Sequence, residues 1–257
     1  MSTPSRRKLL IDTDAGVDDA QAILMALKCP DVDVIGITCV AGNADAMQVG
    51  KNVLRVDYHG SDGFGDVPDP EAPDDSLLES EHAVNALMRL SKKQEGKGNM
   101  TVAAEFNFYF DPEAAYVVLN QLKAPITIVT WETCMEHSIP WEFYSNIRDK
   151  GGDVCNFLSK IEKKSCEYAK KQKWATFMPA DEYLIACVLR PNVIKTCCDV
   201  YATVDVKGHY TWGQMIVDWQ KVLKRPNNVC VVTDINQDIF EGMLADLFIN
   251  KDTHRRT

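Results

Sequence analysis

The chain has 257 residues, of which 46% are hydrophobic and 25% charged, so it can bury a sizeable core and is expected to form one domain over residues 1–257. Its net charge of −9 argues against a nucleic-acid surface, because phosphate binding depends on clusters of lysine and arginine. No stretch approaches the roughly 20 apolar residues that a membrane span needs, and nine cysteines without a CxxC pair favour reduced thiols. We therefore expect a cytoplasmic protein that binds neither nucleic acid nor membrane.

Strands and helices alternate along the chain. An apolar strand is predicted at residues 8–11, and residues 18–28 have the apolar spacing of a helix with acids in its first turn. The same patterns predict strands at 34–40, 126–130, 201–206 and 229–233, helices at 81–90, 180–189 and 238–249, a helix that starts at Asp111-Pro112-Glu113, and a long loop at 61–76. This alternation predicts an α/β fold with a mostly parallel open sheet flanked by helices.

The sequence LLIDTDAGVDDAQAI, residues 9–23, concentrates negative charge directly after the first predicted strand. In open α/β sheets ligands gather at the carboxyl ends of strands, so a functional site is expected here. Oxygen ligands and a glycine that permits a tight turn suit a hard cation, Ca²⁺ or Mg²⁺. An EF-hand is excluded, because the twelfth position of such a loop would be Ile23. The ordinary alternative, helix-start acids and a turn, leaves Asp14 unexplained; the four aspartates are Asp12, Asp14, Asp18 and Asp19.

Three further stretches carry polar groups at informative positions. AGNADA, residues 41–46, places Asn43 after a strand and a glycine. In NMTVAAEFNFYFDPEAA, residues 99–115, Glu105 and Asn107 are two positions apart and share a face if the segment is extended, and an amide beside a carboxylate is a common way to bind hydroxyls. In MPADEYLIACV, residues 178–188, Asp181 opens a helix, either as its N-cap or as a site residue.

Together these four stretches resemble the nucleoside hydrolase family, the inosine/uridine-preferring N-ribohydrolases. The family signature D-x-D-x-G-x-D-D is complete at residues 12–19, and GN, EFN with DPEAA, and the later helix-opening aspartate follow in the family's order, down to GQMIVDW at 213–219. The resemblance implies a Rossmann-like fold and an enzyme that hydrolyses the N-glycosidic bond of ribonucleosides to free base and ribose. It also implies Ca²⁺ as cofactor, a ribonucleoside as partner, and leaves a homo-oligomer open.

The resemblance also implies roles for individual residues. Asp14 would be a metal ligand and the general base that takes a proton from the attacking water, Asp19 a bidentate ligand, and Asp181 the carboxylate that completes the cation site. Cleavage builds positive charge on the ribose ring, so a carboxylate-rich pocket stabilises the transition state more than the neutral substrate. The ribose hydroxyls would be bound by Asp18, Asn43, Asn99, Glu105 and Asn107.

The sequence departs from the family at the leaving group. Some members carry a histidine immediately before the last metal ligand, where this chain has Ala180. Candidates for a base pocket or loop contact are the aromatic residues Tyr168 and Trp174 and the histidines His59 and His137, although such residues are more often structural.

Two internal segments of the family pattern are absent. After Val56 the chain passes directly to DYHGSDGFGD, without the strand that follows the second helix in the family. In addition, SKKQEGKG stands between Leu90 and Gly98, where the family has a strand, a loop with a metal-binding carbonyl, a helix and another strand. One alternative is therefore a catalytically impaired isoform that binds a nucleoside or a protein partner. Another is a haloacid-dehalogenase-like phosphatase, with Asp12 as nucleophile and Asp14 as acid/base.

Overall fold

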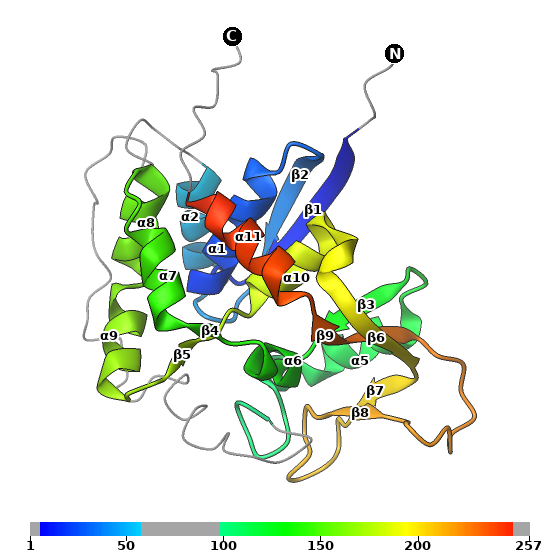
Figure 1. Ribbon diagram of the computed structural model, residues 1–257. Helices are drawn as coiled ribbons and strands as arrows, with labels where there is room; N and C mark the ends of the chain where they lie inside the picture. Colours follow the sequence, from blue (N-terminus) through cyan, green and yellow to red (C-terminus); the bar gives the residue numbers. More distant parts are fainter. Residues whose placement is uncertain (1–5, 58–97, 249–257) are drawn as a thin grey trace, which may run out of the picture. The chain divides into compact units, whose positions relative to one another are not determined.

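The computed structural model describes residues 6–57 and 98–248 (Figure 1). The predicted helix at 81–90, the predicted loop at 61–76 and His59 lie outside the described residues. The described residues form two compact units, which we call the first unit, from the segments Met1–Pro68, His137–Val193 and Asn236–Thr257, and the second unit, from the segments Asp69–Glu136 and Ile194–Ile235. A single domain over the whole chain stays a prediction.

The first unit begins with two parallel strands whose carboxyl ends lie at the same edge. Their pairing runs from Arg7 opposite Val32 to Thr13 opposite Cys39, so the segments that follow the two strands start side by side. The strands and helices predicted at 8–11, 18–28 and 34–40 are confirmed, with small changes at their ends. These first elements are β1 (Arg7–Thr13), α1 (Val17–Lys28), β2 (Val32–Cys39) and α2 (Ala46–Asp57).

Helix α1 is the central helix of the first unit. All its residues from Ala20 to Ala26 are buried, and it packs against α10 (Asp181–Leu189) and α11 (Gln237–Leu247), as Figure 1 shows. The guanidinium of Arg7 donates hydrogen bonds to the last carbonyls of α10, Val188 at 2.8 Å and Leu189 at 2.7 Å. This contact satisfies carbonyls at the end of α10 and ties that helix, whose first residue is Asp181, to β1.

A buried polar network joins α1 to α7 and to the residue between α8 and α9. The side-chain amide of Gln21 donates to the Tyr144 hydroxyl and to Glu162 Oε1, both at 3.0 Å, and Tyr144 donates to the same Glu162 oxygen at 2.8 Å. The Tyr144 ring also stacks on Phe177, with centroids 3.8 Å apart. The remaining elements of the first unit are β4 (Ile139–Pro140), α7 (Trp141–Arg148), α8 (Asp153–Ile161), α9 (Lys163–Lys171) and β5 (Thr176–Phe177), with a 3₁₀ turn, η2, at Pro191–Val193 after α10.

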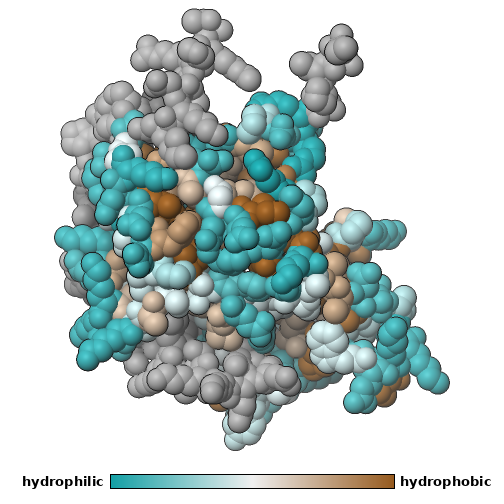
Figure 2. Space-filling model, in the orientation of Figure 1, coloured by the Kyte–Doolittle hydropathy of each residue, from teal (hydrophilic) through white to brown (hydrophobic). Residues whose placement is uncertain are grey.

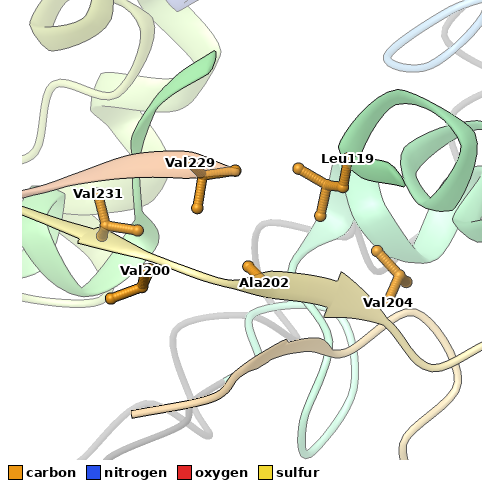
Figure 3. Packing of buried hydrophobic residues seen from close by; sticks show 6 residues of the cluster. All are labelled: Leu119, Val200, Ala202, Val204, Val229 and Val231. Carbon is orange, nitrogen blue, oxygen red and sulfur yellow. The ribbon is translucent and has the colours of Figure 1, made fainter. Parts of the chain in front are cut away.

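The second unit is built on a three-stranded sheet with β9 in the middle, parallel to β3 and antiparallel to β6. Its core contains aliphatic side chains from α5, β6, β7 and β9, namely Leu119, Val200, Ala202, Val204, Val229 and Val231 (Figure 3). The elements are α4 (Phe106–Phe110), α5 (Pro112–Gln121), β3 (Ile126–Val129), α6 (Trp131–Glu136), β6 (Ile194–Val200), β7 (Ala202–Val204), β8 (Met215–Val217) and β9 (Val229–Ile235).

Helix α5 starts as the sequence predicts. The Asp111 carboxylate accepts a hydrogen bond from the Ala114 amide at 2.9 Å, and Pro112 occupies the first helical position. The strand predicted at 201–206 is shorter, Ala202–Val204, and strand β6 precedes it where the sequence predicted none.

The α/β fold is confirmed, and its strands form several small sheets. Among the residues that the structure describes, no strand joins the β1–β2 pair to the sheet of the second unit.

On the face of the molecule drawn in Figure 2, hydrophilic residues cover most of the surface and apolar ones appear in small patches between them. Within residues 6–57 and 98–248, no helix combines the length and apolar character needed to cross a membrane.

Candidate active site

The turn after β1 holds the first acids of the site in a fixed conformation. The Thr13 hydroxyl accepts a hydrogen bond from the Ala15 amide at 3.0 Å, and the Asp19 carboxylate accepts one from the Gly16 amide at 2.8 Å. Ala15 has a φ of +47°, in the left-handed region that residues with a Cβ rarely adopt. The chain reverses here so that Asp14 leaves the strand and α1 starts three residues later.

Asp14 is fixed against the loop that follows β2. The backbone amide of Asn43 donates to Asp14 Oδ2 at 2.8 Å, and the Asn43 side chain donates to Oδ1 at 3.0 Å. A Cβ on Gly42 would lie 2.1 Å from Asp14 Oδ2, and a Cβ on Gly16 would lie 2.5 Å from Asn43 Nδ2. Both positions therefore need glycine, because the two loops approach each other too closely for a side chain.

Three carboxylates from two helices converge beside this turn. Oxygen atoms of Asp18 and Asp19, in the first turn of α1, and of Asp181, the first residue of α10, lie within 4.8 Å of one another. We call these three residues the acidic cluster. Asp14 lies next to it, in side-chain contact with Asp19.

Asp181 is not the N-cap of α10, which was one of the two explanations for this residue. The N-cap of α10 is Ala180, and it is the Glu182 side chain that accepts a hydrogen bond from the Ala180 amide, at 2.9 Å. Asp181 therefore does not cap the helix, and its carboxylate points to the other acids of the cluster.

Burial and mutual repulsion make this arrangement electrostatically unfavourable when all the acids are ionised. Burial raises the pKa of Asp181 well above its usual range, and repulsion from Asp18 and Asp19 raises it further. Burial also raises the pKa of Asp18 and of Asp14, and repulsion from Asp19 adds to the shift at Asp14, whereas the hydrogen bonds from Asn43 lower it. A cation with oxygen ligands would offset this repulsion, so the residues present fit a hard divalent metal.

Asn99, Glu105 and Asn107 lie together in the second unit, around the start of α4. The side-chain oxygen of Asn99, which is 5% exposed, accepts from the Phe106 amide at 2.6 Å. Glu105 is the N-cap of α4 and accepts from the amides of Asn107 at 3.0 Å and Phe108 at 3.2 Å. The segment is therefore not extended, which was the condition for Glu105 and Asn107 to share a face, because the Glu105 carboxylate caps a helical turn that contains Asn107.

The aromatic candidates for a base pocket have structural contacts in the first unit. The rings of Tyr168 and Trp174 pack edge to face with centroids 5.5 Å apart, and the Trp174 carbonyl accepts from the Trp141 indole at 3.0 Å. The carbonyl of His137 accepts a hydrogen bond from the Tyr183 hydroxyl, and their two rings lie 6.4 Å apart. A role in base binding stays a prediction for these residues.

Two residues of the site region were not predicted from the sequence. Thr13 occupies a variable position of the signature, and its residue type carried no signal of a contact with an aspartate six positions later. Glu182 follows Asp181 and is fully buried, and an acid in a first helical turn looks like an ordinary surface residue.

Comparison with known proteins gives the family. The model of the inosine-uridine preferring nucleoside hydrolase family matches residues 9–57 and 93–242. The pyrimidine-specific ribonucleoside hydrolase RihA of Escherichia coli O81 (strain ED1a) is 29% identical over 304 residues, covering 93% of this chain and 97% of that protein. RihA of Shigella flexneri matches with the same identity and coverage.

The alignment with RihA supports a loss of internal segments from this chain. About 239 residues of this chain (93% of 257) are aligned over 304 positions, so about 65 positions have no counterpart in this chain.

Solved structures of nucleoside hydrolases are similar to this protein along nearly the whole chain. An inosine-guanosine nucleoside hydrolase has a TM-score of 0.75 and 27% identity, covering 95% of this chain and 99% of its own. The purine-preferring ribonucleoside hydrolase from Gardnerella vaginalis, at 21% identity, shows the same fold with a TM-score of 0.71, covering 94% of this chain and 99% of its own. The phosphatase alternative is therefore set aside, and its nucleophile candidate Asp12 instead accepts a hydrogen bond from Thr38 on β2. The chain belongs to the inosine-uridine preferring nucleoside hydrolase family.

Proposed function

We propose that this protein hydrolyses the N-glycosidic bond of ribonucleosides and releases the free base and ribose. The observation that carries the proposal is the acidic cluster at the carboxyl end of β1, with Asp14 fixed beside it by two hydrogen bonds from Asn43. The family match supports the same reaction.

We further propose that the metal is Ca²⁺, held by Asp14, Asp19 and Asp181, with Asp18 close enough to contribute to the charge of the site. Carboxylate oxygens suit this ion, and it accepts variable ligand sets in which water completes the coordination. When bound, it would lower the pKa of a water molecule in the site.

Asp14 is the proposed general base. In the metal-free protein burial and the neighbouring Asp19 raise its pKa, and a bound cation would lower that pKa, so the carboxylate would be ionised and able to accept a proton from water. The hydrogen bonds from Asn43 fix both of its oxygens, so the carboxylate keeps one orientation as the proton is transferred. The negative charge of the cluster would also stabilise the positive charge that develops on the ribose ring.

Binding of the ribose hydroxyls stays a proposal for Asp18 and Asn43 in the first unit and for the Asn99, Glu105 and Asn107 group in the second. Asn43 already donates to Asp14, so we propose that its effect on the reaction comes through that contact as well.

The relatives differ in the base that they prefer. They are described as pyrimidine-specific, inosine-guanosine and purine-preferring hydrolases. A substrate panel should therefore contain both inosine and uridine. A cytoplasmic location and a homo-oligomer stay predictions.

A nucleoside-binding protein with impaired catalysis is the second candidate. It is favoured by the roughly 65 aligned positions that have no counterpart in this chain.

One pair of measurements separates the two candidates. Release of ribose from inosine and uridine should be assayed with Ca²⁺ and after treatment with a chelator, beside calorimetric titration with the same nucleosides. Ca²⁺-dependent ribose release supports the hydrolase, and nucleoside binding without turnover identifies the impaired form. If folded, Ca²⁺-loaded protein shows no turnover and binds no nucleoside, both candidate functions are contradicted.

A further inference from the structure

Thr13 connects the end of β1 to the acidic cluster. It is the last residue of the strand and is 4% exposed, and its carbonyl accepts a hydrogen bond from the Val40 amide at 3.0 Å. Its hydroxyl lies between the Ala15 amide and Asp19 Oδ1 and bonds to both.

The direction of these hydrogen bonds follows from the groups present. The Ala15 amide can only donate, so the Thr13 oxygen must accept from it, and the single hydroxyl proton is left for Asp19. The Gly16 amide donates to the other oxygen of Asp19 at 2.8 Å. Each oxygen of this carboxylate therefore has one neutral protein donor and keeps lone pairs for another partner.

We propose that Thr13 is a positioning residue that orients the Asp19 carboxylate for the cation, an inference that rests on the proposed function. A neutral hydroxyl suits this task, because a lysine or arginine in its place would fix the carboxylate but would also compete with the metal for its charge. The neighbouring carboxylates of Asp18 and Asp181 repel Asp19, so donors that fix its two oxygens oppose rotation of the carboxylate away from the cluster.

The chain offers matched variants for a test. Thr13→Val keeps the shape of the side chain and removes the hydroxyl, and Thr13→Ser keeps the hydroxyl. Thr38→Val is the control: Thr38, on β2, donates the same kind of hydrogen bond to Asp12, an aspartate outside the acidic cluster. A merely structural role for the Thr13 hydroxyl would lower stability without changing the affinity for the metal.

The experiment is calorimetric titration of the full chain with Ca²⁺, with urea unfolding of the same proteins in chelator. Loss of a hydrogen bond to a charged group should weaken Ca²⁺ binding about tenfold or more in Thr13→Val. Thr13→Ser and Thr38→Val should bind within about twofold of the wild type. Should Thr13→Val fail to fold, Thr13→Ala replaces it with the same expected loss.

Two results would overturn the inference: wild-type Ca²⁺ affinity in folded Thr13→Val, or an equal loss in Thr38→Val. Absence of Ca²⁺ binding by the wild type would overturn it as well. Ribose release, assayed on the same proteins, separates this inference from the proposed function. A wild-type protein that binds Ca²⁺ but releases no ribose contradicts the function alone, and active Thr13→Val with undiminished affinity contradicts the inference alone.

Discussion

At the scale of single residues, the site depends on close approach of backbone and side chains. Gly42 and Gly16 leave room for Asp14 and Asn43 to meet, and Ala15 adopts a left-handed conformation between them. A Cβ in this conformation costs roughly 1–2 kcal/mol, a cost that recurs at functional sites where the surrounding structure fixes the backbone.

Replacement of Ala15 by glycine should therefore stabilise the fold. Relief of the left-handed strain exceeds the extra chain entropy of glycine, so the free energy of unfolding should rise by about 0.5 kcal/mol. Ala22→Gly, in the buried middle of α1, is the matched control and should lower it by about 1 kcal/mol or more. Urea unfolding measures both, and a loss of stability in Ala15→Gly equal to the control would show that no strain is stored at this turn.

At the scale of elements, a buried polar network holds α1 against α7 and the junction of α8 and α9. Its only carboxylate is Glu162, which accepts from Gln21 and Tyr144 and lies 3.3 Å from Arg148. Burial raises the pKa of Glu162 to about 7, although Arg148 and Tyr144 act to lower it. The position of the helix that carries Asp18 and Asp19 thus depends on a carboxyl group that titrates near neutral pH.

Protein stability should therefore fall as the pH rises through this range. In the unfolded chain Glu162 titrates near 4.3, so the folded state holds its proton more tightly, and the free energy of unfolding decreases between about pH 4.3 and pH 7. Glu162→Gln should reduce the difference in stability between pH 5 and pH 8 by about 2 kcal/mol. Urea unfolding in chelator tests this, with exposed Glu167→Gln on α9 as control. An unchanged pH dependence in Glu162→Gln would refute the shifted titration.

The elements that could be predicted from the sequence are those with strong local signals. The apolar strand before the aspartates, the helix α1 and the Asp-Pro start of α5 depend on nearby residues, and all three are confirmed. Strand β6, IKTCCDV, was missed because its charged and thiol side chains give no apolar alternation, and its place is set by pairing with β9.

The candidate site likewise has some features that could be predicted from the sequence and others that could not. The clustered aspartates are close in sequence, so their importance could be predicted. The contact between Asp14 and Asn43 depends on the parallel pairing of β1 with β2, and the helical start at Glu105 depends on capping, so neither geometry could be read from spacing alone.

At the scale of the whole molecule, the chain retains the family's motifs with fewer residues between them. Parallel sheets of α/β proteins are normally covered on both faces. On the β1–β2 pair, however, Leu10 and Ile35 are each 62% exposed. These two side chains of the strand pair are therefore largely open to solvent.

Ile35→Thr should consequently change stability little, by about 0.5 kcal/mol or less, because most of the side chain already contacts solvent. The buried Ile23 on α1 is the contrast, and Ile23→Ala should cost about 2–5 kcal/mol. Urea unfolding at low protein concentration measures both. A cost above about 2 kcal/mol for Ile35→Thr would mean that this face is covered in solution.

The central claim, that Asp14 is the base of a Ca²⁺-dependent ribohydrolase, is tested most directly by ribose release from Asp14→Asn and Asp12→Asn proteins loaded with Ca²⁺. The amide of Asp14→Asn cannot accept the proton of the water, so turnover should fall by a factor of about 10² to 10⁴ in protein that remains folded. Asp12→Asn, which removes a carboxylate that bonds only to Thr38 among the contacts described, should keep most of the activity. Ribose release by Asp14→Asn at nearly the wild-type rate would contradict the account.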